Sequence, residues 1–430
     1  MKKAFSLLLA LLMALSAVGL AAAQNPYEVT EPITITWWHA HEDQWHPYLQ
    51  YMVDKFNEQN PLITVEPVYI GAYAEINTQL IAAIASGDVP ALCTANTSYP
   101  PSYGAAGICE ILDPYIAAYN FPIEDFGEGL IKATTYNGQQ IVLPYLISTQ
   151  VMFYNKTAAE AEGIEMPKTF DEMDAFLEKA TLFNEDGTTK RYGTVFGGWD
   201  YWYYEMLFKN NGVKVINDDG MTTDINGEAS VYVTTKMKEW IDKGYAYYAY
   251  GTGASTDMRQ LFWDGGAFSV FHTSSLFDLY VTNVGDKFEV GMAWLPGGMD
   301  GESFYSEIGG ATILIPAVAT QKQKNAAWQF MMFMASPEIN LYWADKTGYF
   351  PTRQSVMETP EYAEYLSRKP EMNNVVSMGS WINPRHTHPA YDTIANQWRH
   401  TLYRIFNEDA PIQATLDELA IFIEETLADY

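Results

Sequence analysis

Ile33-Thr34-Ile35-Thr36-Trp37 begins the stretch that decides the fold of this chain. Apolar and polar residues alternate along it, directly after Pro32, which predicts a β-strand. Hydrophobic spacing predicts four further elements in the residues that follow: a helix over 45–56, a strand over 63–70, a helix over 74–86 and a strand over 91–95. Strands and helices that alternate in this way form a parallel sheet with helices on both faces.

The alternation continues to the end of the chain. Beyond a turn at Asn137-Gly138 we expect a long extended run over 140–155, and then Thr169 as the N-cap of a helix with Glu172 as its capping-box partner. Later elements are expected as follows: helices over 231–243, 324–334 and 336–346, buried strands over 289–295 and 311–315, and a mostly helical tail over 391–430. There is no internal repeat and no flexible linker, so the prediction is an α/β protein of two lobes joined by short crossovers.

The composition narrows the class of protein. The 430 residues carry 25 Lys and Arg against 53 Asp and Glu, a formal charge of -28. Nucleic acid and anionic lipid surfaces both need a basic partner, so this balance argues against either. Hydrophobic residues make up 48% and aromatic residues 15%, which is enough for large cores and too much for a disordered chain.

Residues 1–23 are predicted to be a secretory signal peptide. Two lysines precede an apolar run over 4–20, and the small residues of an A-x-A site follow, so cleavage is expected before Gln24. No cysteine stands at the cut to accept a lipid anchor, and no later apolar run approaches the roughly 18 to 20 residues that span a bilayer. We therefore expect an exported, soluble protein, periplasmic or extracellular.

Two cysteines, Cys93 and Cys109, allow two interpretations. In an oxidising compartment they could close a short loop, and such a disulfide contributes about 3 kcal/mol by the chain-entropy argument. Alternatively, both are buried free thiols, since cysteine is among the most buried residue types. The sequence has no C-x-x-C motif, so neither interpretation gives a redox or metal site.

The familiar catalytic motifs are missing from the sequence. It has no G-x-S-x-G elbow, no phosphate-binding loop, no H-E-x-x-H and no dinucleotide fingerprint. A glycosidase pair of carboxylates is set in space and not along the chain, so a secreted carbohydrate-active enzyme stays an alternative.

Five of the seven histidines gather in two places. They are His39, His41 and His46, beside Glu42 and Asp43, and His386 and His388, just after Arg385. Imidazole and carboxylate suit zinc or manganese, so a metal-binding receptor is one alternative. An H-x-H pair at a strand end also points both rings to one side, as a ligand cleft would use them for hydrogen bonds. We expect structural or ligand-contacting histidines, with no metal and no cofactor.

Aromatic residues crowd into two short segments, 199–204 and 245–250. Sugar rings present apolar C–H faces that stack on aromatic planes, while Tyr and Trp edges supply hydrogen bonds. Most aromatic rings in a protein of this size belong to the core, so roughly two or three of these are expected to touch a ligand.

Over nearly the whole mature chain, the sequence resembles the extracellular solute-binding proteins of carbohydrate-class ATP-binding-cassette importers. The matching stretches are TWWH (36–39), FNEQNP (56–61), ASGDVP (85–90), LP (143–144), FYNK (153–156), PKTFDE (167–172), FWDGG (262–266), IGGA (308–311) and KTGYFPT (346–352). The resemblance implies the maltose-binding-protein type of fold, with two α/β lobes, three hinge crossings and a ligand trapped by hinge closure. It places the crossings near Ser148, 307–310 and 358–361, the N-terminal lobe in 24–147 plus 311–358, and the C-terminal lobe in 148–310 plus 359–430.

Within this family, the contact positions of glycerol-phosphate binders fall on six residues here: Tyr73, Ser148, Ser274, Gly309, Tyr349 and Arg385. The family's ligand-gripping glutamate falls at about Thr97, where this sequence departs from the pattern. Neutral-sugar binders also carry an Arg followed by Pro and Tyr in the region of Arg385. Because stacking is useful for rings, the aromatic enrichment favours a sugar, and a glycerol-phosphate or related polyol-phosphate binder is the alternative.

The resemblance thus implies a receptor, not an enzyme, that captures a mono- or oligosaccharide and presents its closed form to the membrane permease subunits of an importer. We expect a monomer that binds no nucleic acid. The expected contacts are Trp38, His39, Tyr73, Thr97 and Tyr349 from one lobe, Trp199, Trp202, Ser274 and Arg385 from the other, and Ser148 and Gly309 at the hinge.

Overall fold

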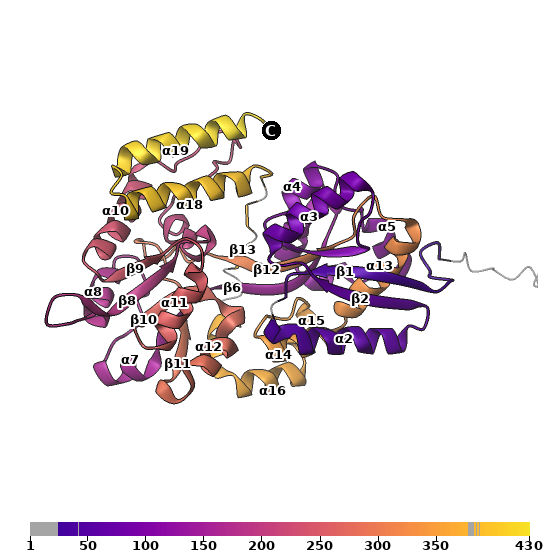
Figure 1. Ribbon diagram of the computed structural model, residues 1–430, viewed down its shortest axis with the longest axis horizontal. Coiled ribbons are helices and arrows are strands. Elements are labelled where there is room, and N and C mark those ends of the chain that lie inside the picture. The colour runs from indigo at the N-terminus through magenta and orange to yellow at the C-terminus, as the bar shows by residue number, and fades with distance from the viewer. Residues whose placement is uncertain (1–24, 42, 377–381, 384, 387) are drawn as a thin grey trace, which may run out of the picture.

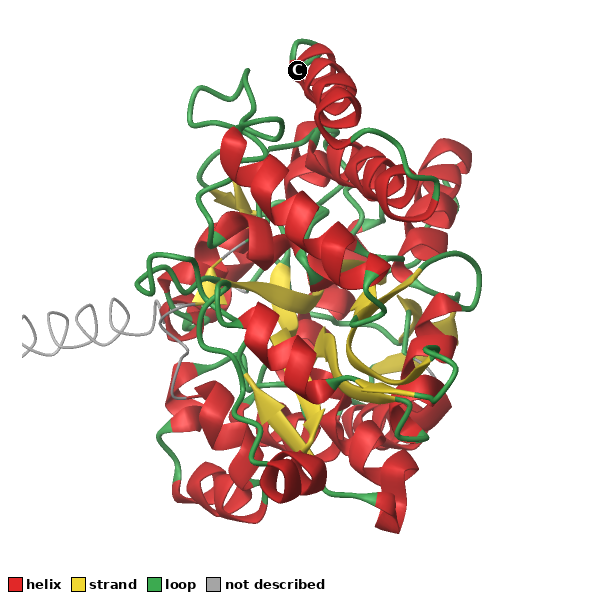
Figure 2. Ribbon diagram, turned by 90° about the vertical axis from the view of Figure 1, so that its left-hand side faces the viewer, coloured by secondary structure: helices red, strands yellow, loops and turns green. Residues whose placement is uncertain are grey.

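A twisted sheet runs through the protein and is shared by both lobes (Figure 1). The computed structural model describes residues 25–41, 43–376, 382–383, 385–386 and 388–430; the predicted signal peptide lies outside them. In spatial order the strands are β2 (Ile63–Tyr69), β1 (Ile33–His39), β3 (Leu92–Asn96), β12 (Ser306–Leu314), β6 (Leu143–Asn155), β10 (Ala267–Thr273), β8 (Thr189–Gly197) and β7 (Leu182–Phe183). Beside this path, β11 (Val290–Ala293) pairs with β6, β13 (Ile382–Asn383) with β12 and β9 (Ala246–Ala249) with β8. Helices cover the strands on the outside (Figure 2).

The first lobe is built on the predicted β-α-β-α-β unit, which is confirmed. Strand β1 pairs in parallel with β2 and β3, and α2 (His46–Gln59) and α3 (Tyr73–Ser86) connect them. Gly87 ends α3 in the left-handed conformation that favours glycine. The shorter elements of this part are η1 (Asp43–Trp45), α4 (Pro100–Ala105), α5 (Asp113–Tyr119), η2 (Ile123–Phe126), α6 (Glu128–Thr134), β4 (Thr135–Tyr136) and β5 (Gln139–Gln140).

Two strands, β6 and β12, cross from one lobe to the other. They lie antiparallel, with Ser148 opposite Gly309. At its first-lobe end β12 pairs with β3, whereas the far end of β6 pairs with β10 and β11. A Cβ on Gly309 would lie 2.5 Å from the Trp202 ring, so only glycine lets the ring approach the strand this closely.

The second lobe places β8 parallel to both β9 and β10. The elements between the crossing strands are α7 (Lys156–Glu162), α8 (Met173–Ala180), η3 (Tyr201–Tyr203), α9 (Glu205–Lys209), α10 (Glu228–Asp242), α11 (Ala254–Trp263), η4 (Ser274–Leu276), α12 (Phe277–Val284) and η5 (Gly285–Lys287). The tail supplies α16 (Pro360–Arg368), α17 (Pro370–Val376), α18 (Tyr391–Asn407) and α19 (Ile412–Leu427). Buried residues of α18 and α19 belong to the same core as those of α8 and α10.

After β12 the chain returns to the first lobe. The returning helices are α13 (Gln321–Met334), α14 (Pro337–Thr347) and α15 (Gln354–Met357). In Figure 1 the orange α13 lies among the indigo and violet elements, and Trp328 and Phe330 of this helix pack in one core with Trp37 and Phe56. Each lobe is therefore assembled from separate stretches, while the lobe boundaries at 147/148, 310/311 and 358/359 stay a prediction.

The predicted capping box at Thr169 is wrong. Helix α8 begins four residues later, at Met173. Thr169 forms a parallel β-bridge with Gly297, and this pairing holds the segment in an extended form. The Glu172 carboxylate instead accepts a hydrogen bond from the backbone N–H of Lys168 at 2.6 Å. A tertiary contact thus overrides a local helix signal.

Cys93 and Cys109 are both free thiols in this structure, and both are buried in one small apolar cluster. Burial raises the pKa of each thiol, so both are poor nucleophiles at neutral pH. Of the two interpretations from the sequence, the structure agrees with buried thiols.

Replacing Gly310 by alanine is expected to destabilise the protein more than the same change at Gly251. The two residues have φ of +104° and +94°, so each substitution costs about 1 to 2 kcal/mol in backbone strain. At Gly310 the new Cβ would also lie 2.2 Å from the carbonyl oxygen of Leu146, whereas at Gly251 no atom lies within 4 Å. Urea denaturation should give the lower midpoint for Gly310→Ala; equal midpoints would contradict the tight packing of β6 against β12.

Candidate ligand-binding site

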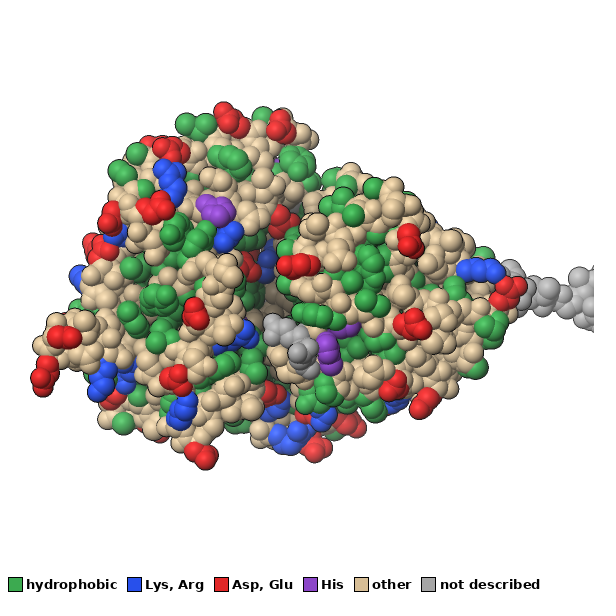
Figure 3. All heavy atoms as spheres, viewed as in Figure 1, with side chains coloured by type: hydrophobic (Ala, Val, Ile, Leu, Met, Phe, Trp, Pro, Cys, Tyr) green, Lys and Arg blue, Asp and Glu red, His purple; other side chains and the backbone are tan. Residues whose placement is uncertain are grey.

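A groove lies between the two lobes (Figure 3). It holds two cavities with common walls, an inner chamber of about 300 Å³ and an outer chamber of about 780 Å³. Both are lined by Tyr73 and Asn96 of the first lobe and by Trp199, Asp200 and Arg385 of the second. A molecule bound here would therefore touch both lobes at once.

The aromatic wall of the inner chamber comes from a tight turn after β8. Glycine is needed at Gly197, because a Cβ there would lie 2.9 Å from the Trp199 ring. The Asp200 carboxylate accepts a hydrogen bond from the backbone N–H of Trp202 at 3.0 Å and so caps η3. The turn presents three rings to the chamber: Trp202 is nearly fully buried, whereas Trp199 and Tyr203 stay partly exposed.

Arg385 forms the polar side of the same chamber. Its guanidinium lies over the Trp202 ring, 4.9 Å from the centroid, which is a cation–π contact. Its Nε donates to the carbonyl of Ile308 at 3.2 Å, and the Thr97 hydroxyl donates to the same oxygen at 3.3 Å. Burial opposes the charge, but Tyr201 and then Asp200 raise the pKa of Arg385, so the side chain remains cationic.

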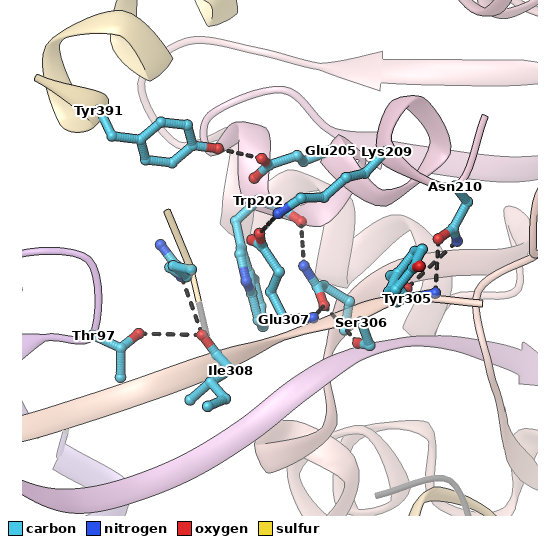
Figure 4. Close-up of polar contacts among 12 residues, drawn as sticks. Thr97, Trp202, Glu205, Lys209, Asn210, Tyr305, Ser306, Glu307, Ile308 and Tyr391 are labelled. Carbon is cyan, nitrogen blue, oxygen red and sulfur yellow. Dashed lines mark hydrogen bonds and ion pairs between the residues drawn. The ribbon is translucent and has the colours of Figure 1, made fainter. Parts of the chain in front are cut away.

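Behind this wall lies a buried network of charged side chains (Figure 4). Glu205 and Glu307 are 1% and 0% exposed. The Tyr391 hydroxyl donates to Glu205, and the Lys209 ammonium pairs with Glu307. Burial, followed by repulsion from Glu307, raises the pKa of Glu205 to about 8. Burial opposes the ionisation of Glu307 too, but Lys209, His386 and Arg385 together lower the Glu307 pKa, so the two acids differ in protonation at neutral pH.

Gln150 joins the network to the crossing strands. It is fully buried on β6, and its side-chain amide donates to the Trp202 carbonyl at 3.0 Å. Its oxygen accepts from the Ser306 hydroxyl at 2.7 Å and from the backbone N–H of Glu307 at 2.8 Å. One side chain thus ties β12 to the turn that carries the aromatic wall.

Six of the predicted contact residues line the inner chamber: Tyr73, Ser148, Trp199, Trp202, Tyr349 and Arg385. The other five pack elsewhere: Trp38, His39, Thr97, Ser274 and Gly309. Trp38 packs in an apolar cluster with Ala83, and the buried Ser274 hydroxyl accepts a hydrogen bond from the backbone N–H of Thr149 at 3.1 Å. A direct ligand contact for any of these residues stays a prediction.

Further residues line the inner chamber beyond the predicted contacts, among them Asp200, Tyr203, Arg259 and His272. Aromatic crowding in 199–204 could have found Tyr203. Arg259 on α11 and His272 on β10 belong to elements of ordinary composition and to no motif. Only the fold brings them together.

The two groups of histidines have ring partners within the protein. The H-x-H pair at the end of β1 does point both rings to one side: His39, the last residue of the strand, and His41 stack with centroids 5.4 Å apart. Burial, followed by repulsion from His46, lowers the pKa of His39 to about 4. His386 lies against Tyr391, and His388 against Tyr430. No cluster of three or more potential metal ligands occurs among the described residues, which leave out Glu42.

Comparison with known proteins agrees with this architecture. The family model for bacterial extracellular solute-binding proteins matches residues 51–371. A curated relative, the sn-glycerol-3-phosphate-binding periplasmic protein UgpB of Yersinia pestis, is 24% identical over 374 residues, which is 82% of this chain and 81% of the relative.

Two solved structures share the fold. One is UgpB from Mycobacterium tuberculosis in complex with glycerophosphocholine, with a TM-score of 0.81 and 21% identity over 92% of this chain and 99% of that chain. The other is the GacH receptor of Streptomyces glaucescens, with a TM-score of 0.79 and 20% identity over 92% and 99%.

The shared fold, the cleft and the matching family model together define the class as a two-lobe solute-binding protein. The chain belongs to the bacterial extracellular solute-binding protein family. Proteins of this class serve ATP-binding-cassette importers: they bind a solute and deliver it to permease subunits. Among the described residues, no helix combines the length and apolarity that a membrane span requires.

The buried Glu205 is expected to make stability depend on pH. Its pKa is about 8 in the native protein against an ordinary 4.5, so between these values only the native state holds the proton. This contribution is largest in acid and is lost as pH rises toward 8, by at most about 1.4 kcal/mol per pH unit. Glu205→Gln has no proton to lose, so its stability relative to the wild type should rise by more than about 1 kcal/mol between roughly pH 6 and pH 8.

Urea denaturation at several pH values measures this difference. Glu425→Gln, at an exposed position of α19, is the matched control and should follow the wild-type profile. Parallel profiles for Glu205→Gln and the wild type would contradict a protonated Glu205.

Proposed function

We propose that the protein captures a carbohydrate, either a mono- or an oligosaccharide, in the cleft between its lobes. The observation that carries this proposal is Trp199, whose partly exposed ring borders both chambers. Two charged side chains, Asp200 and Arg385, line the same two chambers as Trp199. A sugar needs this combination, because its C–H faces stack on a ring while its hydroxyls take hydrogen bonds at the edge.

The two chambers favour a solute with more than one ring. The outer chamber continues between α3 and α18 and is lined by both apolar and polar groups, the polar ones including Asn77, Ser98, Asp392 and Asn396. One ring could pack against Trp199 while the next lies toward these side chains. The solved GacH receptor in complex with acarbose supports this proposal by its shared fold.

A polyol phosphate such as glycerol phosphate is the second candidate. The names of the UgpB relatives and the two arginines of the inner chamber favour it. One difference from the glycerol-phosphate binders argues against a polyol phosphate. Where they have a glutamate that holds the ligand, this chain has Thr97, which is buried and donates its hydroxyl to the Ile308 carbonyl.

We further infer that the solute drives hinge closure by population shift. It would contact both lobes only in the closed form, so its differential affinity favours that form, which the permease then receives. Strands β6 and β12 and residues 358–361 would be the hinge. The protein would act as an exported monomer, periplasmic or extracellular, and would release its ligand chemically unchanged.

Trp199→Ala is expected to weaken sugar binding by about 1 to 3 kcal/mol without loss of folding. A thermal-shift screen of the chain without residues 1–23 against sugars, sugar phosphates and polyols would first identify a ligand. Calorimetry would then compare Trp199→Ala with the wild type and with Tyr232→Ala, which removes an exposed ring from α10. Equal affinities in all three proteins would rule out stacking on Trp199.

Incubation of the same sugar with the protein separates a receptor from an enzyme. A receptor returns the sugar intact after saturation. Steady release of a shortened or altered product would overturn the proposal of a binding protein.

A further inference from the structure

The inner chamber is lined by a buried histidine whose ring makes no hydrogen bond within the described part of the chain. His272, on β10, is 2% exposed and lines the chamber. Neither of its ring nitrogens has a hydrogen-bond partner among the described residues. Its ring lies parallel to that of Tyr203, with centroids 4.8 Å apart and an interplanar angle of 11°, so stacking fixes its orientation. An unpaired buried polar group is costly, and in a cavity wall it points to a ligand group at that place.

An arginine without a counter-ion lines the same wall. The Nε of Arg259, on α11, donates to the Ser255 carbonyl at 3.3 Å, and its guanidinium makes no ion pair within the described part of the chain. Burial, followed by the charge of Arg259, lowers the pKa of His272 to about 3. The imidazole is therefore neutral and offers one N–H donor, while the guanidinium fork offers several.

Two helices begin at this wall. The first turn of α11 brings Ser255 to the chamber, one turn before Arg259. The continuous η4 and α12 segment brings Ser275 and Leu276 to it. The amino-terminal end of a helix carries partial positive charge and free N–H groups, which favour an anion. At η4 the Thr273 hydroxyl already accepts from the backbone N–H of Ser275 at 3.4 Å, so α11, which has no side-chain cap, offers the available end.

The charge of the chamber is opposite to that of the whole protein. Its charged lining residues are Arg259 and Arg385 against Asp200, whereas the chain carries -28. Acidic side chains are scattered over the visible face of both lobes in Figure 3. Arg385 already contacts the Trp202 ring and the Ile308 carbonyl, so Arg259 is the cation whose donors remain available.

We propose that Arg259 and His272, with the amino-terminal end of α11, form an oxyanion subsite in the inner chamber. This inference rests on the proposed capture of a carbohydrate and narrows it. The captured carbohydrate carries a carboxylate or a phosphoryl ester, as in a uronic acid or a sugar phosphate. The guanidinium and the imidazole N–H donate to its anionic oxygens, and the sugar ring lies against Trp199.

Matched pairs of acidic and neutral sugars test the subsite by calorimetry. The pairs are glucuronate with glucose, galacturonate with galactose, and glucose 6-phosphate with glucose; glycerol 3-phosphate and inorganic phosphate are added as oxyanions without a ring. In at least one pair the acidic member should bind about tenfold tighter than the neutral one, because charge-assisted hydrogen bonds are the stronger kind. Arg259→Gln should reduce that preference about tenfold, and Arg259→Lys should retain part of it.

The controls separate the subsite from general charge and folding effects. Arg404→Gln removes a cation from an exposed pair with Glu418 on the same lobe and should leave the preference unchanged. His272→Phe keeps a ring against Tyr203 but loses both nitrogens, so it should weaken the acidic sugar more than the neutral one. His272→Gln restores a donor and should recover part of the loss. Thermal melting of each variant checks that it is folded.

The outcomes distinguish this inference from the proposed function. If neutral sugars bind as tightly as their acidic partners, or if Arg259→Gln weakens both alike, the subsite is overturned while carbohydrate capture stands. If glycerol 3-phosphate or phosphate binds and no sugar does, the subsite stands and carbohydrate capture is contradicted. If none of these compounds binds the wild type, the oxyanion subsite is overturned.

Discussion

The pairing of β6 with β12 is the constraint on which the rest of the structure depends. These two strands belong to both lobes, and they pair Ser148, which lines the inner chamber, with Gly309 on the opposite strand. Glycine at the contact lets the Trp202 ring lie directly on the strand. Gln150, from the same pair, holds the carbonyl of that tryptophan and the backbone of β12 together. The position of the aromatic wall therefore depends directly on the pairing of the two crossing strands.

The buried charges follow from this arrangement. Arg385 lies where the second lobe meets β12, and although burial opposes its charge, Tyr201 and then Asp200 raise its pKa, so it remains charged. Behind Arg385, Lys209 and Glu307 form an ion pair. Burial and the nearby charge of Glu307 keep Glu205 protonated and therefore neutral. Such groups are costly to bury unless each has a partner, so the network favours one geometry of the wall over alternatives.

Much of the fold could be predicted from the sequence, because it rests on local periodicity. The alternation at Ile33–His39 and the helical spacing that follows give the first parallel strands correctly. The capping box at Thr169 fails because a bridge to Gly297 overrides it. The residues of the candidate site are harder to predict. Aromatic crowding indicates Trp199 and the family resemblance indicates Arg385, but no local sequence pattern indicates Arg259 or His272. Their nearness exists only after α11 and β10 have packed.

The return of the chain to the first lobe has a consequence for the order in which the protein becomes stable. Trp37 and Phe56 emerge early in synthesis, yet they share a core with Trp328 and Phe330, which are added much later. The earlier half therefore exposes an unfinished apolar face until the intervening lobe has been made. Contacts so distant along the chain slow folding, since a long loop must close before they form. A nascent chain of this design stays incompletely folded for most of its synthesis, a state suited to handling by chaperones.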